Sequence, residues 1–463
     1  MILNILFAVA SIVFCIVAPS GCDVRFCWTV AWMYIAQNIL FVLLDDKKNK
    51  WGFTLFFCIS FFFCNFAYPL FYYTERPDYS FFNISFPTDV INRSTAIAYM
   101  GYAFFMLGQT RFFRMRREEP DPPRFKVGMN QYLFFFIAAL SAFAGYLFFG
   151  GWQALQNVYS GNGNLRDVGI YSYFNNIFTL SAYLMAIFVF RIDKRYRWFY
   201  VLVLLCSMGI IVSTGSRSLT LGLLLIIFVG FNNNIRRFRW SEMLVLMVIG
   251  VFGMFLVMTV RKMQVGDSWM NALANLHIQN PVDIFKDLTI NCRNLYVLTD
   301  FGETHPNTWF HGMLVDVCSP IPGMTGWLVN HFQEPVELLH GGDLPTYLAF
   351  GANMSWGLGT NMIGEAFRSF GYAGVAVAMW LIGQIVKDSY YASSHNVYAY
   401  TIYYLFVSHA VIYPRAPLLF DPRTIVWTLL MVWIVQTLTT NPQCHVWGQK
   451  ILVRLQQLSD RKQ

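Results

Sequence analysis

Residues 130–149 read NQYLFFFIAALSAFAGYLFF, a run of twenty residues without a single charge. An α-helix of this length is about 30 Å long, which matches the hydrocarbon thickness of a lipid bilayer. The whole chain repeats this pattern, since 56% of its 463 residues are hydrophobic and only 13% are charged. A soluble domain has about 25% charged residues. Because such a chain cannot cover a water-facing surface, the sequence predicts an all-α, polytopic membrane protein.

Twelve apolar segments are long enough, or nearly long enough, to cross a membrane as helices. They are residues 2–18, 26–44, 51–70, 95–110, 130–149, 176–190, 198–213, 218–231, 242–260, 362–386, 398–413 and 424–440. The pair 198–213 and 218–231 is the shortest, so a re-entrant hairpin is an alternative to two full spans there. The sequence predicts about twelve transmembrane helices.

Basic residues are concentrated in every second connection between these segments. Residues 111–126 contain six Lys or Arg side chains, and residues 191–197 contain four. Cytoplasmic connections carry such an excess, so both termini are predicted to lie in the cytoplasm. Because the net charge of +8 is distributed in this way, it indicates orientation in a membrane, and we expect no nucleic-acid partner.

The predicted topology divides the chain into four parts. Residues 1–260 contain transmembrane helices 1–9, residues 261–361 form one long periplasmic loop, residues 362–440 contain helices 10–12, and residues 441–463 form a basic cytoplasmic tail. Six prolines interrupt the long loop, which predicts a folded cap of short amphipathic helices. Two smaller outer segments, 71–94 and 150–175, are candidates to pack beside this cap.

The conspicuous charged residues lie at the outer ends of the spans, whereas the span centres contain almost none. Residues 213–218, STGSRS, place Arg217 in a tight turn between the two shortest spans. A guanidinium group at that depth suits a lipid-linked phosphate or diphosphate. The alternative is an arginine that extends to lipid head groups or fixes the topology.

Two further outer arginines lie at the ends of spans. Arg261 ends the ninth span, where a plain interfacial anchor is the alternative. Arg415 lies between two prolines in residues 413–417, YPRAP, which restrict the backbone around it. His409 lies one turn before Tyr413 on the same helix face. Arg415 is therefore a candidate functional residue, with Tyr413 and His409 as candidate substrate-binding residues beside it.

Residues 357–368, GLGTNMIGEAFR, lead from a glycine-rich loop into a predicted helix start. Glu365 lies in the first turns of that helix, where a carboxylate can act as a general base toward a sugar hydroxyl. The alternatives are compensation of the helix dipole or an ion pair with Arg368, three residues later. We rank Glu365 with Arg217 and Arg415 as candidate catalytic residues, and Arg261, Arg293, Arg368, Tyr413 and His409 as candidate substrate-binding residues.

Cysteine and histidine spacing gives no metal site, and we expect neither a metal nor a cofactor. Most of the nine Cys residues lie in or beside apolar spans, where Cys behaves as a small hydrophobe. Cys292 and Cys318 share the long loop, so a disulfide between them is left open. The loop also contains several His and Asp residues, and no pair among them has convincing metal-ligand spacing. These residues are His277, His305, His311, His331, His340, Asp300, Asp316 and Asp343.

At these motifs the sequence resembles the Wzy-type O-antigen polymerases, a family of oligosaccharide repeat-unit polymerases that includes the enterobacterial common antigen polymerase. The resemblance covers residues 175–435. It depends on the Ser-Thr-Gly-Ser-Arg turn that ends at Arg217, on Arg261 at a span end, on the run from Gly357 to Glu365 followed by FGYAG at 370–374, and on the Pro-Arg pair at Arg415.

The resemblance implies a metal-independent glycosyltransferase of the C type in the bacterial inner membrane. Such an enzyme joins oligosaccharide repeat units carried on undecaprenyl diphosphate, so both donor and acceptor are lipid-linked. Arg217, Arg261 and Arg415 match the family's outer arginines, which hold the diphosphate, and Glu365 matches its acid. A chain-length regulator protein is the implied partner. The alternatives are the related O-antigen ligase and a twelve-span flippase or transporter of lipid-linked glycans.

Overall fold

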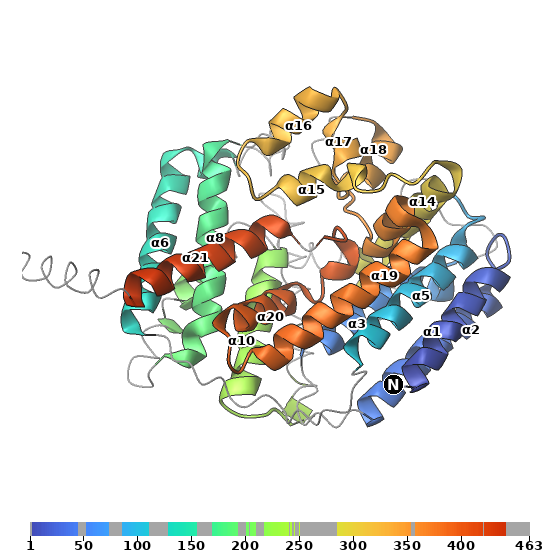
Figure 1. Ribbon diagram of the computed structural model, residues 1–463, viewed down its shortest axis with the longest axis horizontal. Coiled ribbons are helices and arrows are strands. Elements are labelled where there is room, and N and C mark those ends of the chain that lie inside the picture. Colours follow the sequence, from blue (N-terminus) through green and yellow to red (C-terminus); the bar gives the residue numbers. More distant parts are fainter. Residues whose placement is uncertain are drawn as a thin grey trace, which may run out of the picture.

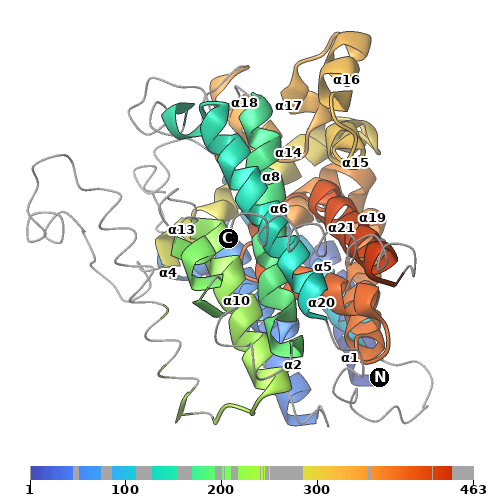
Figure 2. The same ribbon diagram turned by 90° about the vertical axis from the view of Figure 1, so that its left-hand side faces the viewer.

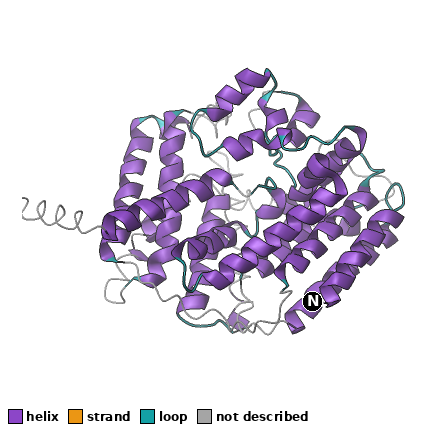
Figure 3. Ribbon diagram, in the orientation of Figure 1, coloured by secondary structure: helices purple, strands orange, loops and turns teal. Residues whose placement is uncertain are grey.

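A computed structural model covers the chain, and the structure describes most of the residues between 2 and 440. The described residues are 2–44, 52–73, 86–110, 128–154, 169–192, 201–202, 204–209, 217–239, 241–242, 245, 250, 285–352, 357–419 and 421–440. Within these ranges the chain forms helices and loops and no strand (Figure 3). The predicted all-α class is therefore confirmed for the described residues.

The first half of the chain consists mainly of long apolar helices, with one short helix and one 3-10 turn. They are α1 (Ile2–Val17), α2 (Val24–Leu44), α3 (Phe53–Asn65), α4 (Ala67–Phe71), α5 (Ile91–Gln109), α6 (Met129–Phe148), α8 (Ile170–Phe188), the 3-10 turn η2 (Val189–Arg191) and α10 (Arg217–Asn234). These helices coincide with predicted apolar segments. The predicted span at 198–213 is described only in part, and that at 242–260 lies almost wholly outside the described residues.

The second half begins with short helices and ends with long ones. The short elements are α13 (Lys286–Thr289), α14 (Asn291–Thr304), η4 (His311–Met313), α15 (Leu314–Cys318), α16 (Met324–Phe332), α17 (Val336–Leu339) and α18 (Leu344–Phe350). The later ones are α19 (Met362–Ala392), α20 (Val397–His409), η5 (Tyr413–Arg415) and α21 (Pro422–Thr440). Helices α15–α18 lie together at one end of the molecule, and the N-terminal end of α1 lies at the other (Figures 1 and 2).

Four described helices are long and apolar enough to cross a membrane: Val24–Leu44, Asn130–Phe148, Ile170–Arg191 and Met362–Ala392. Shorter apolar helices are present at Ile2–Val17, Phe53–Asn65 and Ser218–Asn234. Large apolar side chains on α1 and α6, such as Ile16 and Leu140, are exposed. Exposed apolar surface of this kind suits lipid. The chain is consistent with a helical membrane protein, and the number of twelve spans stays a prediction.

Helix α5 is the central element of the core, because nearly all of its side chains are buried. It packs along α19, with α1 and α2 on its other side (Figure 1). Two glycines let the α5 and α19 backbones approach: a Cβ on Gly108 would lie 2.3 Å from the Trp380 carbonyl, and one on Gly383 would lie 2.3 Å from the Phe105 carbonyl. Close packing through small residues is typical of helices in membranes. This pair fixes the helix that carries Glu365.

Two helix ends differ from the sequence prediction. Helix α19 continues to Ala392, past the predicted end at 386, and bends at Gly371, whose φ of +67° is accessible mainly to glycine. Helix α20 ends at His409, four residues before the predicted end. Residues Tyr413–Arg415 instead form a 3-10 turn with Pro414 near its start, because proline cannot donate the backbone hydrogen bond that continues an α-helix.

Candidate functional site

Four asparagines hold the glycine-rich loop before α19. The Asn361 side chain caps α19, since its Oδ1 accepts hydrogen bonds from the Ile363 and Gly364 backbone N–H groups. Its Nδ2 donates to the side-chain oxygens of Asn65 and Asn291, each at 2.9 Å. Asn294 donates to the carbonyls of residues 358 and 359, both at 3.1 Å. The loop is thereby tied to α3 and α14, and the start of α19 is fixed.

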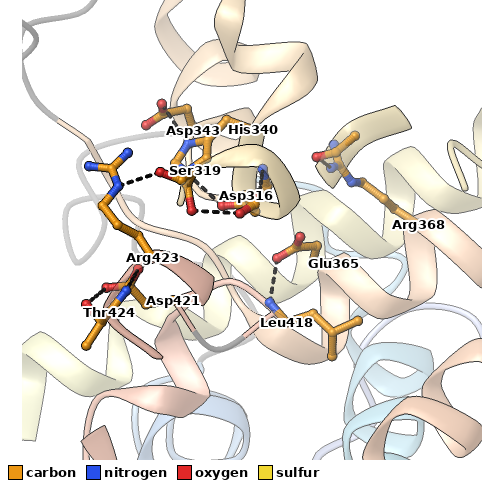
Figure 4. A network of polar contacts seen from close by, with 12 residues as sticks. Asp316, Ser319, His340, Asp343, Glu365, Arg368, Leu418, Asp421, Arg423 and Thr424 are labelled. Carbon is orange, nitrogen blue, oxygen red and sulfur yellow. Dashed lines mark hydrogen bonds and ion pairs between the residues drawn. The ribbon is translucent and has the colours of Figure 1, made fainter. Parts of the chain in front are cut away.

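Glu365 lies one turn into α19 and is completely buried. Its Oε2 accepts a hydrogen bond of 2.9 Å from the backbone N–H of Leu418, in the loop between η5 and α21 (Figure 4). Among the described residues, Oε1 has no hydrogen-bond partner. Gly341 covers this oxygen, because a Cβ at that position would lie 2.0 Å from it. The carboxylate is thus enclosed between α19, the 413–418 segment and the turn before α18.

Arg368 is also buried, one turn further along α19, at 1% exposure. Its Nη2 donates to the carbonyl of Gly312 at 2.8 Å, while its Nε has no partner in the described part of the chain. Within that part, no ion pair joins Arg368 to Glu365, so the predicted alternative of an i,i+3 ion pair does not apply. The two side chains point to different neighbours in Figure 4. Arg368 fixes η4 above the start of α19.

Three side chains of the cap form a hydrogen-bonded row above Glu365 (Figure 4). His340 is the middle member, with its Nε2 at 3.0 Å from Asp316 and its Nδ1 at 2.9 Å from Asp343. Asp316 also accepts a 3.0 Å hydrogen bond from the Gly341 N–H. Burial lowers the pKa of His340, but the hydrogen bonds and charges of the two aspartates outweigh it and raise the pKa to about 10. His340 is therefore an imidazolium at neutral pH.

The 413–418 segment joins η5 to the Glu365 pocket. The Tyr413 hydroxyl is buried and donates to the Leu418 carbonyl at 3.0 Å. Leu418 is the residue whose N–H binds Glu365. The Arg415 carbonyl lies near Gly359, where a Cβ would be 3.6 Å from it. The structure therefore brings the YPRAP motif and the GLGTNMIGEAFR motif together, although about fifty residues separate them in the sequence.

The other candidate residues have contacts of their own or lie outside the described residues. His409 lies at the end of α20, where its Nδ1 is 2.7 Å from the Ser408 hydroxyl and its ring packs edge-on against Tyr183. Arg293 lies on α14 and lines a separate cleft. Arg217 begins α10, but its side chain is not described, and Arg261 lies outside the described residues.

Sequence reasoning did not connect the row Asp316–His340–Asp343 with Glu365. The sequence spacing of these loop residues excludes a metal site but says nothing of their contacts, which arise only from the packing of the cap. No group of three described His, Cys, Asp or Glu side chains is arranged to hold a metal ion. Cys292 and Cys318 are both free cysteines, which answers the open question of a disulfide between them.

The fold and the site define an all-helical protein with an apolar outer surface and a buried group of acidic and basic side chains beneath a cap of short helices. The family model of the O-antigen polysaccharide polymerase Wzy matches residues 1–441. The chain belongs to this family, as the motifs predicted. Comparison with curated proteins and with solved structures gives no match. Membership of this family and the apolar helices together indicate a membrane-bound polysaccharide polymerase.

Proposed function

We propose that this protein joins O-antigen repeat units carried on undecaprenyl diphosphate, at the periplasmic face of the bacterial inner membrane. Membership of the polymerase family supports the reaction class. The alternating positions of Lys and Arg support an orientation with the cap outside and both termini in the cytoplasm. The proposal includes about twelve spans on a glycosyltransferase C-like frame and a chain-length regulator as partner.

The observation that carries the catalytic part of the proposal is the enclosed Glu365 carboxylate with one oxygen unpartnered among the described residues. A carboxylate held in this way has a free lone pair with a fixed orientation. A general base needs such a lone pair to accept a proton. Because Gly341 covers that oxygen, an acceptor hydroxyl reaches it only when the turn containing Gly341 moves aside. Access to the base is therefore coupled to movement of the cap.

In the proposed reaction, Glu365 takes the proton from a hydroxyl of the acceptor sugar as its oxygen attacks the anomeric carbon of the donor. The bond from that carbon to the diphosphate breaks, and undecaprenyl diphosphate leaves. Arg217, Arg261 and Arg415 stabilise the negative charge that grows on the leaving diphosphate, since guanidinium groups bind phosphate oxygens with two parallel hydrogen bonds. No metal is required for this charge stabilisation.

The test is the lipopolysaccharide pattern of a deletion strain that expresses variants at equal membrane levels. Glu365→Gln keeps the shape of the side chain but removes the base, and we expect chain extension to fall by about 100-fold, with single repeat units remaining. Arg217→Ala, Arg261→Ala and Arg415→Ala should show the same pattern. Asp388→Asn is the control, because Asp388 is an exposed acid near the other end of α19.

Full ladders in all four site variants would contradict the proposed site. Loss of every O-antigen band, including single units, would instead indicate a ligase or a flippase. The single-unit band therefore distinguishes polymerisation from transport of the glycan and from its attachment to the lipopolysaccharide core.

A further inference from the structure

A cleft of about 430 Å³ lies on the side of α14 away from Glu365. Its lining comes from α14, from α18 and from the segment before α5. The lining residues are Phe86, Pro87, Arg293, Val297, Asp300, Phe301, Thr304, His305, Leu348 and Ala349. Small-molecule sites in proteins are about 300–1,000 Å³. This cleft is large enough for a sugar.

The two faces of α14 have different roles. Leu295, Leu298 and Gly302 pack against α19 at Gly364, Phe367 and Arg368. The other face of α14 lines the cleft with residues at helical spacing, at positions 293, 297, 300, 301 and 304. The cleft is therefore a neighbour of the Glu365 pocket and not part of it. The two are linked through Asn294, which holds the carbonyls of residues 358 and 359.

Arg293 is the buried charge of this cleft, at 2% exposure. The one described hydrogen bond of its guanidinium is long, 3.5 Å from Nη1 to the Asn294 side chain, and its Nε has no partner among the described residues. No described carboxylate forms an ion pair with it, and burial lowers its pKa to about 10. A buried guanidinium without a counter-ion is costly, so an anionic ligand would complete the site.

The remaining walls suit a sugar ring. The rings of Phe301 and His305 stack at 4.1 Å and are nearly parallel, which gives a flat face at the cleft. Asp300 supplies carboxylate oxygens, and the Thr304 hydroxyl, which donates its proton to the Asp300 carbonyl at 2.8 Å, supplies a further acceptor. Burial and the charge of Asp89 raise the pKa of Asp300, whereas Arg93 and His305 lower it. Arg93 itself pairs with Glu303 at 2.9 Å, so this cation already has a carboxylate.

We propose that this cleft binds a sugar with an anionic substituent, either the carboxylate of an acidic sugar or a sugar-linked phosphate. Arg293 pairs with the anion, Asp300 and Thr304 bind ring hydroxyls, and Phe301 with His305 supports the apolar face of the ring. The inference takes only the glycan nature of the ligand from the proposed function. Its place beside the 357–361 loop makes it a subsite for glycan near the reaction centre.

Binding is tested on the full-length protein in lipid nanodiscs with four probes: glucuronate, glucose 1-phosphate, glucose and inorganic phosphate. We expect saturable binding of glucuronate, glucose 1-phosphate or both, and at least 10-fold weaker binding of glucose and of inorganic phosphate. Tighter binding of glucuronate would identify a sugar carboxylate as the anion, and tighter binding of glucose 1-phosphate would identify a sugar-linked phosphate. Equal binding of inorganic phosphate and glucose 1-phosphate, or no binding of any probe, would overturn the inference.

Arg293→Met tests the residue itself. Because the substitution breaks no ion pair with a described residue, we expect the thermal midpoint to stay constant or rise while binding of the anionic sugar falls at least 10-fold. Arg423→Met is the matched control: Arg423 donates to the Ser319 carbonyl at 2.9 Å, so its loss should lower the midpoint and leave binding unchanged. A lower midpoint in Arg293→Met, or unchanged binding, would assign Arg293 a structural role.

The same assay separates this inference from the proposed function. Glu365→Gln should lose polymerisation and keep binding at the cleft, because α14 lies between the two sites. Full ladders and full binding in Arg293→Met would refute only the proposed ligand site in the cleft. Full ladders in Glu365→Gln would refute only the proposed catalytic base.

Discussion

Gly341 and Glu365 are the clearest example of how single residues shape the candidate site. The carboxylate is buried at a point where the neighbouring backbone comes close, and a Cβ at position 341 would lie 2.0 Å from Oε1 and 2.4 Å from Cδ. Both atoms belong to a side chain whose other oxygen is held by Leu418. The carboxylate has little freedom to retreat, so only glycine fits at this position.

Gly341→Ala should therefore disturb the site directly. We expect a loss of about 1–3 kcal/mol in the free energy of unfolding, typical of overpacking, together with shorter O-antigen ladders as Glu365 is displaced. Gly326→Ala is the control, because nothing lies within 4 Å of a Cβ there and alanine favours a helix more than glycine. Thermal unfolding and lipopolysaccharide gels measure both effects. Equal behaviour of the two variants would refute the tight contact.

At this scale the sequence could predict that Glu365 lies near the start of a helix, because glycines followed by an apolar run indicate a helix start. It could not predict the contact between Asp316 and His340. These residues are twenty-four positions apart in a loop of irregular helices, and no periodicity relates them. Contacts between distant loop residues depend on the packing of α15 and α17, which composition does not determine.

At the scale of elements, the candidate site depends most on the N-terminus of α19. Asn361 satisfies two free N–H groups of the helix and two buried amide oxygens from other helices. Asn396 caps α20 with the same pattern, accepting from the N–H groups of Tyr398 and Ala399, but it is exposed. These two caps therefore have the same hydrogen-bond pattern but differ in their surroundings.

Asn361→Ala should cost far more stability than Asn396→Ala. The exposed cap is worth about 1 kcal/mol, whereas loss of Asn361 also leaves buried acceptors on Asn65 and Asn291 without a donor, at about 1–3 kcal/mol each. We expect a clear fall in the thermal midpoint for Asn361→Ala and a small one for Asn396→Ala. Matching midpoints would show that the Asn361 network adds nothing to the cap.

Elements were the most predictable level of this structure. Apolar length alone located α2, α6 and α19, because a span needs about 20 apolar residues. The bend at Gly371 and the early end of α20 were not predictable in this way, since both arise from local backbone geometry inside apolar segments. The near-complete burial of α5 was also not predictable, because apolar residues are suited equally to lipid and to a protein core.

At the scale of the whole molecule, the cap and the helix bundle are joined by a few polar contacts. Arg423 and Trp427 of α21 donate to the carbonyls of Ser319 and Pro320, at 2.9 and 2.8 Å. Gly341 connects the cap to Glu365 of α19, and its N–H binds Asp316. Because Asp316 binds both His340 and the Gly341 N–H, we expect the charge state of the row Asp316–His340–Asp343 to affect how this part of the cap contacts Glu365.

That dependence predicts how the stability of the cap varies with pH. The pKa of His340 is raised from 6.5 to about 10 in the folded protein, because two aspartates stabilise its protonated form. Its contribution to stability is fully present below pH 6.5 and is lost as the pH rises through 10, since the unfolded chain releases this proton first. We expect the thermal midpoint of the wild type to exceed that of His340→Gln by a few degrees near pH 6.5, and this gap to close by about pH 10.5.

His331→Gln is the control, because His331 is exposed on α16 and lies outside the row. The difference in thermal midpoint between His331→Gln and the wild type should therefore stay small at every pH. The comparison of variants at each pH removes the effect of other groups that titrate in the same range. A gap between wild type and His340→Gln that does not change from pH 6.5 to 10.5 would mean that His340 is not an imidazolium held by the two aspartates, and that the cap is fixed to the bundle without it.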